Sequence, residues 1–287
     1  MKKYVIVTDS GSDIPKESLK KWKITSLALS VRFEDGEEFF DYEIEPQRFY
    51  KEMRSGKTAK TAAVNHLTFL EQFRNIAKRG YDILYIGLSS AISSTYSSAR
   101  SAAAVLKKEM TDVEFLTLDS KCASSGLGLL IYLTAKKRDE GADISEAYSY
   151  AEALSPRICH RFTVDDLSYL RRGGRISSAA SIFGNMLGIK PLLYVDSGGF
   201  LKCSEKVKGR RTAIEALAKS YGFFTSEKPS REIFISHADC LSDAELLDEC
   251  LYKKYGCHAK KIFDIGSVIG AHAGPGTLAL FFIGDTR

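Results

Sequence analysis

The stretch YDILYIGLSSAISSTYSSARSAAAVLKKEM (81–110) joins an apolar run to an alanine-rich segment through a turn crowded with serine and threonine. The apolar run is typical of a buried β-strand, and the alanine-rich segment is typical of a helix. Strand and helix in direct succession form the unit of parallel sheets, and the turn between them lies at the carboxyl edge of such a sheet. The stretch therefore predicts an α/β fold.

The same alternation continues on both sides of this stretch. The runs KYVIVTD (3–9) and DVEFLTLDS (112–120) predict further strands, and SSGLGLLIYLTAKKRDEG (124–141) predicts a long apolar helix. Asn65 is placed to cap the helix NHLTFLEQFRNIAKRG (65–80). These elements predict a parallel sheet for the first half of the chain.

The regular alternation of strands and helices ends near Ser155-Pro156, and the sequence after this point indicates antiparallel pairing. The segment KPLLYVDSGGFLKCSEKV (190–207) reads as two strands that turn at a serine-glycine-glycine sequence. Further strands are expected at 158–166, 231–238, 260–266 and 278–285. We therefore expect an amino-terminal α/β domain with a parallel sheet at 1–155 and a carboxyl-terminal α/β domain with a mixed sheet at 156–287.

A hairpin is predicted earlier in the chain. ITSLALSVRF (24–33) and EFFDY (38–42) are separated by Asp35-Gly36, a dipeptide that favours tight hairpin turns. The prediction treats 24–33 as one continuous strand. A helix is expected to follow at 45–56.

Composition limits the possible functions. The net charge of +5 is spread along the chain, and no compact basic run is interleaved with aromatic residues, so nucleic acid is not an expected partner. The apolar run that begins the chain is too short for a signal peptide, and no integral membrane segment is expected. The six cysteines include no C-x-x-C pair, which favours reduced thiols and a cytoplasmic location. No residues have the spacing of a metal site.

The hydroxyl-rich turn at Ser89–Ser94 permits two interpretations. At a carboxyl edge of a sheet it could bind an anion, since hydroxyls and helix N–H groups donate hydrogen bonds there. It could also be a helix that merely tolerates serine. Two other stretches favour the anion site: the loop GKTAKTAAVN (56–65), and GAHAGPGTLALFF (270–282), which holds His272 in a turn of small residues.

Five motifs together resemble the DegV family of bacterial fatty-acid-binding proteins. They are TDSGSDIP (8–15), KTAAVN (60–65), ISSTYSSA (92–99), LSYLRRGGRI (167–176) followed by GIKPLL (188–193), and GAHAGPGTLALFF (270–282). The resemblance covers nearly the whole chain. It implies two α/β domains with a long-chain fatty acid between them and no cofactor. It also implies a fatty acid kinase as a partner, because some members present the fatty acid to this enzyme for phospholipid synthesis.

The resemblance also implies which residues bind the carboxylate of the fatty acid: Thr61, Ser93, Ser94 and His272. Two positions depart from the family pattern. The sequence TAAVN lacks the usual serine and proline after Thr61, and Ser94 replaces a turn glycine, where it either adds a donor or crowds the head group. Arg171, Arg172 and Arg175 match a family stretch that could form an inter-domain edge or a kinase-docking face.

A carrier needs an apolar slot and a few hydroxyls, and the sequence offers both. Burying a sixteen-carbon tail removes roughly fifteen methylenes from water, about 12 kcal/mol before the entropy of binding is counted. Each hydrogen bond to the carboxylate contributes about 1.5–3 kcal/mol. The tail then supplies most of the affinity and the head group fixes the orientation. We therefore expect a lipid-binding carrier and no enzyme.

A serine hydrolase acting on an acyl ester is the alternative. Gly87-Leu88-Ser89-Ser90-Ala91 approximates the G-x-S-x-G motif of a nucleophile elbow, and histidines follow later in the chain. The closing glycine is missing. A phosphoryl-transfer enzyme has less support, because Gly11 stands where a second aspartate is expected after Asp9.

Overall fold

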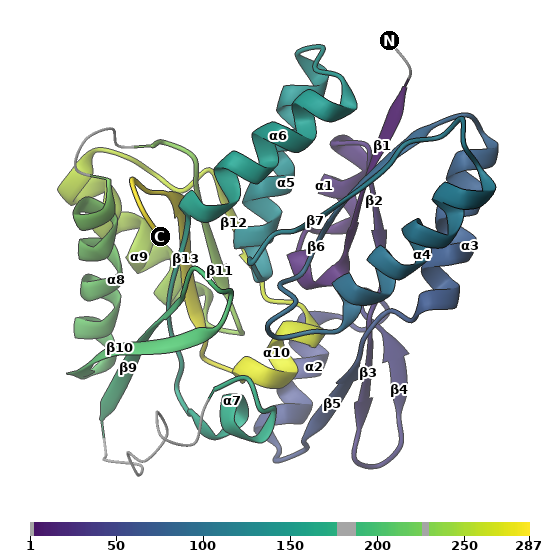
Figure 1. Ribbon diagram of the computed structural model, residues 1–287. Coiled ribbons are helices and arrows are strands. Elements are labelled where there is room, and N and C mark those ends of the chain that lie inside the picture. The colour runs from purple at the N-terminus through teal and green to yellow at the C-terminus, as the bar shows by residue number, and fades with distance from the viewer. Residues whose placement is uncertain (1–2, 177–187, 226–229) are drawn as a thin grey trace.

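The computed structural model describes residues 3–176, 188–225 and 230–287, and it contains a four-stranded parallel sheet in the amino-terminal part (Figure 1). The order of its strands is β2-β1-β6-β7. Their bounds are β1 Tyr4–Asp9, β2 Ile24–Leu27, β6 Asp82–Gly87 and β7 Phe115–Asp119. The predicted parallel sheet is thereby confirmed.

Helices cover both faces of this sheet. On one face lie α3 (His66–Lys78) and α4 (Thr95–Glu109), and on the other lie α5 (Ser124–Asp139) and α6 (Ile144–Leu154) (Figure 1). The short helix α1 (Lys16–Lys21) packs beside β2. Asn65 caps α3 as predicted, since its side chain accepts a hydrogen bond from the backbone N–H of Thr68. The strong helix formers and this cap explain why the helix begins where it does.

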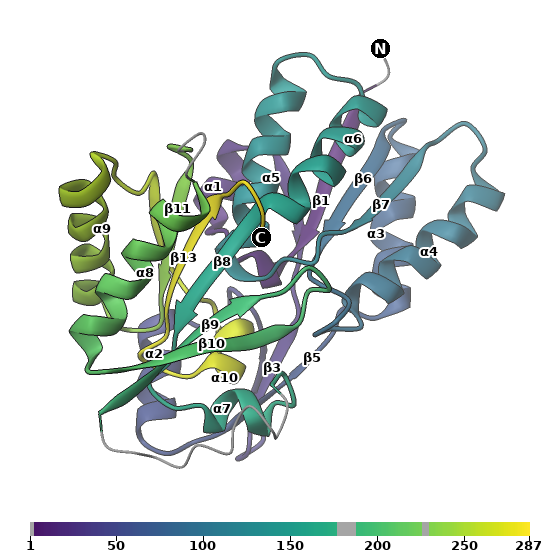
Figure 2. The same cartoon turned by 60° about the vertical axis from the view of Figure 1, so that its left-hand side comes forward.

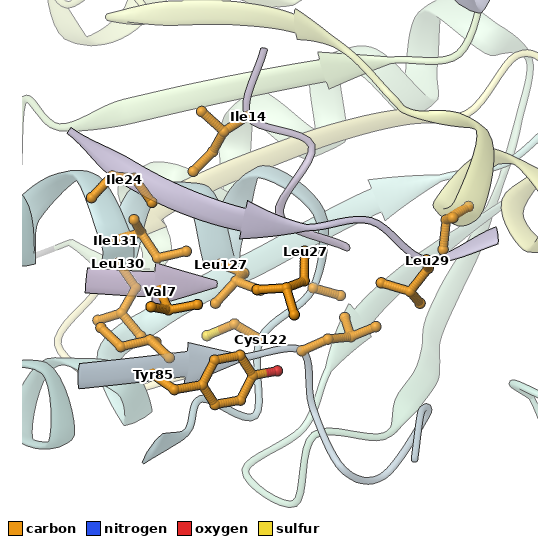
Figure 3. Close-up of a cluster of buried hydrophobic side chains, with 14 of the residues drawn as sticks. Val7, Ile14, Ile24, Leu27, Leu29, Tyr85, Cys122, Leu127, Leu130 and Ile131 are labelled. Atoms are coloured by element: carbon orange, nitrogen blue, oxygen red, sulfur yellow. The ribbon is translucent and has the colours of Figure 1, made fainter. Parts of the chain in front are cut away.

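The core of this region includes buried side chains of the sheet and of α5. Figure 3 shows Val7 of β1 and Tyr85 of β6 in one cluster with Leu127, Leu130 and Ile131 of α5, and the Tyr85 ring also packs against α3, where its centroid lies 5.1 Å from that of Phe69. All of these side chains are buried. The helix α5 is apolar around its whole circumference because it is covered on all sides.

The carboxyl-terminal part forms a six-stranded mixed sheet with the order β10-β9-β8-β13-β11-β12. All neighbours are antiparallel except β11 and β12. The strands are β8 Ile158–Thr163, β9 Ile189–Val195, β10 Leu201–Lys208, β11 Ile233–His237, β12 Lys261–Asp264 and β13 Leu278–Ile283. Helices α8 (Arg210–Phe224) and α9 (Leu241–Tyr255) cover its outer face (Figure 2). The predicted mixed sheet is confirmed.

A third, three-stranded antiparallel sheet was not predicted. It has the order β4-β3-β5, with β3 Ser30–Phe33, β4 Glu38–Phe40 and β5 Ala59–Ala62, and α2 (Pro46–Arg54) follows β4. The hairpin at Asp35-Gly36 is confirmed, but the single strand expected at 24–33 is wrong. The chain leaves the parallel sheet after β2, where the N–H of Leu29 donates to the Ser10 hydroxyl, and enters the small sheet at β3.

Within the described ranges, four further short elements were not predicted. They are η1 (Ser10–Ser12), η2 (Ser155–Arg157), α7 (Ser168–Arg172) and α10 (Ser267–Ala273). The last of these corrects the setting of His272, which lies in a helix and not in a turn. Among the described residues, no helix is both long enough and apolar enough to cross a membrane.

Candidate ligand-binding site

A cavity lies between the carboxyl edge of the parallel sheet and the inner face of the mixed sheet. Its wall is mainly apolar, with Leu88 and Ile92 from the turn after β6 and Phe162 from β8. Thr61, Ser93, Arg175 and His272 supply polar groups to the same wall, as do three further polar side chains, Ser124, His160 and Thr277. We call this space the inter-sheet cavity. A slot with apolar walls and a few polar groups is typical of a site for an amphipathic small molecule.

Alternate residues of β13 point to the two faces of the mixed sheet, so this strand contributes both to the inter-sheet cavity and to the outer core. Ala279 and Phe281 face the inter-sheet cavity, whereas Leu280 and Phe282 pack in the outer core under α8 and α9. Opposite Phe281, the neighbouring strand β8 places His160 against its ring, with the two centroids 5.3 Å apart. Successive strand residues point to opposite faces, so alternating apolar residues on β13 line both spaces.

Thr61 and His272 meet at the cavity. The hydroxyl Oγ1 of Thr61 and the ring Nε2 of His272 lie 2.8 Å apart, in a hydrogen bond between β5 and α10. Thr61 belongs to a strand, which corrects the loop expected at 56–65, because it pairs with Val31 of β3. The strand fixes the direction of the Thr61 side chain more firmly than a loop would.

Ser93 reaches the cavity from the turn before α4. Its hydroxyl lies 2.9 Å from that of Thr95 and accepts a hydrogen bond from the Thr95 N–H at 3.2 Å. Ser94 is the N-cap residue of α4, but its side chain is exposed, makes no capping bond and does not line the cavity. The structure therefore brings Thr61, Ser93 and His272 to one cavity and leaves Ser94 outside it.

Arg175 is a site residue that the sequence reasoning did not single out. Its Nε donates to the Ile92 carbonyl at 3.1 Å and a terminal nitrogen donates to the Gly173 carbonyl, while its side chain lines the cavity. Arg171 and Arg172, in the same motif, are exposed at the end of α7. The sequence analysis noted the motif RRGGR, but only the three-dimensional structure shows that its last arginine, Arg175, lines the cavity.

Burial shapes the electrostatics of this site. Desolvation lowers the pKa of Arg175, and no ion pair joins Arg175 to a carboxylate within the described residues. Desolvation, and then the nearby Arg175 charge, lower the pKa of His272 to about 4. His272 is therefore neutral at pH 7, while a guanidinium stays charged at that pH. The cavity wall thus holds a half-buried positive charge that has no carboxylate partner among the described residues.

Gly173 allows the segment after α7 to approach His272. A Cβ atom at Gly173 would lie 2.2 Å from Nδ1 of His272, far closer than real contacts allow. The glycine is therefore required by space and not by backbone conformation. It holds the ring of His272 between this segment and Thr61.

Ser89 does not have the surroundings of a nucleophile. It is fully buried, and its hydroxyl donates to the Gly199 carbonyl at 3.2 Å and accepts from the N–H of Ala91. Of the two histidines considered as a base, His272 bonds to Thr61, and Nδ1 of His237 lies 3.7 Å from Asp264 without a hydrogen-bond partner among the described residues. The described hydrogen bonds of Ser89 join it to backbone groups and not to a histidine or a carboxylate that could act as a general base.

Asp9 organises the turn that follows β1. Its carboxylate accepts hydrogen bonds from the N–H groups of Gly11 and Leu88 and from the Tyr85 hydroxyl. Across the part of the chain that the structure describes, no group of three or more His, Cys, Asp or Glu residues is arranged to hold a metal ion.

Known proteins share this chain's sequence and fold. The family described as "Uncharacterised protein, DegV family" matches residues 3–285. A DegV domain-containing protein of Clostridium perfringens is 41% identical over 100% of this chain and 99% of its own length. Among solved structures, a DegV lipid-binding protein of Thermotoga maritima is 30% identical with a TM-score of 0.85, and covers 99% of both chains. DegV of Bacillus subtilis, described as a fatty acid binding protein, is 27% identical with a TM-score of 0.85, over 99% of this chain and 100% of that one. This chain belongs to the DegV family.

Proposed function

We propose that this protein binds a long-chain fatty acid in the inter-sheet cavity, with the carboxylate at Thr61, Ser93, Arg175 and His272. The observation that carries the proposal is the half-buried Arg175 guanidinium on a mainly apolar wall, with no carboxylate partner among the described residues. Removing a charge from water is costly unless the charge is paired, and a fatty acid brings a carboxylate together with a tail that suits the wall.

The four head-group residues have complementary roles in this proposal. Arg175 provides charge and has donors beyond the two already used on carbonyls, since a guanidinium has five N–H groups. Thr61 and Ser93 provide hydroxyl donors. His272 stays neutral, so it orients Thr61 without adding a second positive charge. The apolar wall from β8 and β13 accommodates the tail.

We infer that the protein is a carrier in the cytoplasm and that it presents its fatty acid to a fatty acid kinase. Support comes from the site itself: its described residues offer binding groups, and the described hydrogen bonds of Ser89 join it to backbone groups and not to a general base. We also propose that the chain divides into domains at 1–155 and 156–287, because η2 (Ser155–Arg157) connects the parallel sheet to the mixed sheet. The fatty acid then lies between the two.

The serine hydrolase alternative gains no support from the surroundings of Ser89. A fluorophosphonate probe labels activated serines, so we expect no modification of Ser89 in the folded protein. Stoichiometric labelling of Ser89 would favour the hydrolase over the carrier.

The direct test is to identify what the protein holds. Protein purified from a bacterial host should release fatty acid on denaturing extraction, detectable by mass spectrometry in about equimolar amount. The Ser93→Ala variant should retain less fatty acid after exchange against lipid vesicles, whereas Ser94→Ala, one residue away and exposed, should retain as much as the unmodified protein. Equal retention by both variants contradicts the proposed role of Ser93, and absence of any lipid contradicts the function.

A further inference from the structure

The helix α10 forms part of the wall of the inter-sheet cavity. It supplies Val268, Ile269, His272 and Ala273. It has no side-chain cap of its own, because its N-cap residue is Gly266. So short a helix is not stable by itself, and its position must be set by contacts from elsewhere in the chain.

Two buried carboxylates make these contacts. The N–H of Gly266 donates to Oδ1 of Asp13 at 3.0 Å, and the N–H and hydroxyl of Ser267 donate to Oδ1 of Asp41 at 3.1 and 2.6 Å. The second oxygen of Asp13 accepts from the hydroxyl of Ser124, the first residue of α5, at 2.5 Å. Asp13 and Asp41 are only 5% and 3% exposed, so these bonds are largely shielded from water.

The three-stranded sheet contacts α10 at both ends. Asp41 directly follows β4 and bonds to Ser267 at the start of the helix, while Thr61 on β5 bonds to His272 in its last turn. Both strands pair with β3, and Figure 1 shows α10 beside this sheet. A helix advances about 1.5 Å per residue, so the two contacts are only about 8 Å apart along its axis. Displacing the first turn must therefore displace His272 relative to Thr61.

Gly266 leaves the room that the two carboxylates need. A Cβ atom there would lie 2.9 Å from Oδ1 of Asp13 and 3.4 Å from either carboxylate oxygen of Asp41. Its φ of −66° suits any residue, so a substitution at Gly266 acts through space alone.

We propose that Asp13 and Asp41 are positioning residues for the head-group site: by fixing the first turn of α10 they set where His272 meets Thr61. Neither aspartate is among the described residues that line the inter-sheet cavity. This inference rests on the proposed fatty acid function. Burial raises the pKa of both carboxyl groups and so disfavours their charged forms. The two aspartates therefore hold the helix through their acceptor oxygens and not through a negative charge.

The test compares alanine with asparagine at each position. Asp13→Ala and Asp41→Ala remove the acceptors, whereas Asp13→Asn and Asp41→Asn keep an oxygen for the helix. Asp143→Ala is the matched control, since it removes an aspartate that caps a different helix, α6. Two quantities are measured: the ring ¹⁵N shifts of His272 in delipidated protein, assigned with His272→Gln, and the affinity for palmitate from displacement of cis-parinarate.

We expect the alanine variants to shift the His272 ring signals and to bind palmitate about tenfold more weakly, the effect of one or two lost buried hydrogen bonds. The asparagine variants and Asp143→Ala should stay within about twofold. Unchanged ring signals or unchanged palmitate affinity in folded Asp41→Ala overturns the proposal.

Gly266→Ala decides the matter if the alanine variants at the aspartates do not fold. This variant keeps both carboxylates. It should shift the His272 ring signals and lower the affinity for palmitate, as the alanine variants at Asp13 and Asp41 do. No change in either quantity overturns the inference. If unmodified protein binds no palmitate, the proposed function fails, and the ring signals, which need no ligand, still decide whether the aspartates position His272.

Discussion

Thr61 and His272 are 211 residues apart in the chain, and their side chains share a hydrogen bond of 2.8 Å beside the inter-sheet cavity. Thr61 belongs to the three-stranded sheet of the first half, and His272 to the helix that precedes the last strand of the mixed sheet. A carboxylate bound at this pair would contact both halves of the molecule at once. A ligand bound there would therefore couple its binding to the relative position of the two sheets.

Removing the Thr61 hydroxyl should weaken the head-group site. Valine has nearly the shape of threonine, so Thr61→Val keeps the strand but loses the bond to His272. We expect palmitate to dissociate about tenfold faster and the free energy of unfolding to fall by about 1 kcal/mol. Stopped-flow transfer to vesicles and urea unfolding measure these changes. Thr117→Val on β7, away from the cavity, should leave the dissociation rate unaltered.

Neutralising Arg175 should separate charge recognition from tail binding. Arg175→Met keeps an apolar side chain in the wall, so hexadecanol, which lacks a carboxylate, should bind almost as before. Palmitate affinity should fall about 10- to 100-fold, the range for a lost charged hydrogen bond. Competition binding with the two ligands measures the difference, and Arg172→Met, at an exposed arginine of the same motif, serves as the control. An equal fall in the affinities for palmitate and hexadecanol would mean that Arg175 maintains the shape of the cavity wall and does not recognise the carboxylate.

His272 should make the ligand-free protein less stable in mild acid. Its pKa is about 4 in the folded chain and ordinarily about 6.5, so between these values the unfolded chain binds the proton and the folded chain does not. Stability from this group is therefore present above pH 6.5 and is lost as pH falls toward 4, by about 3 kcal/mol.

Comparison with His272→Gln isolates this contribution, since other buried groups titrate equally in both proteins. Asp9, for example, has a pKa raised to about 6 by burial, so its contribution to stability is present below its ordinary pKa and falls as pH rises through 6. Urea unfolding at pH 7 and pH 4.5 should show a larger acid loss in unmodified protein than in His272→Gln. Equal losses would show that His272 titrates normally.

Alanine at Gly173 should act through the ring of His272. The added methyl would lie 2.2 Å from Nδ1, so the ring must move away from its place against Thr61. A double-mutant cycle tests this route: Gly173→Ala should destabilise by about 1–3 kcal/mol in the unmodified background and by much less together with His272→Ala. Additive effects of the two substitutions would falsify the contact as the cause.

Much of the fold could be predicted because its signals are local. The strand at 82–87 and the helix at 95–109 follow from apolar and alanine-rich runs, and Asn65 marks the start of α3. The split of 24–33 between two sheets could not be predicted, because β2 and β3 read as one apolar run. What divides them is a distant contact, from the Leu29 N–H to the Ser10 hydroxyl.

In the candidate site, too, the features with local signals could be predicted and those that depend on distant contacts could not. Ser93 follows a strand and could be placed at a sheet edge from the sequence, and the resemblance pointed to Thr61 and His272. The helix around His272 was missed because its first turn is held by Asp13 and Asp41, which are far away in the chain. Arg175 was missed as a site residue because the direction of a single arginine in RRGGR depends on tertiary packing.

The alternation along β13 restricts how this protein can diverge. Phe281 faces the cavity and Phe282 the outer core, so inserting or deleting one residue in the strand would exchange the two faces and spoil both at once. The shape of the cavity can therefore change by replacing side chains at fixed positions, but not by shortening or lengthening this strand.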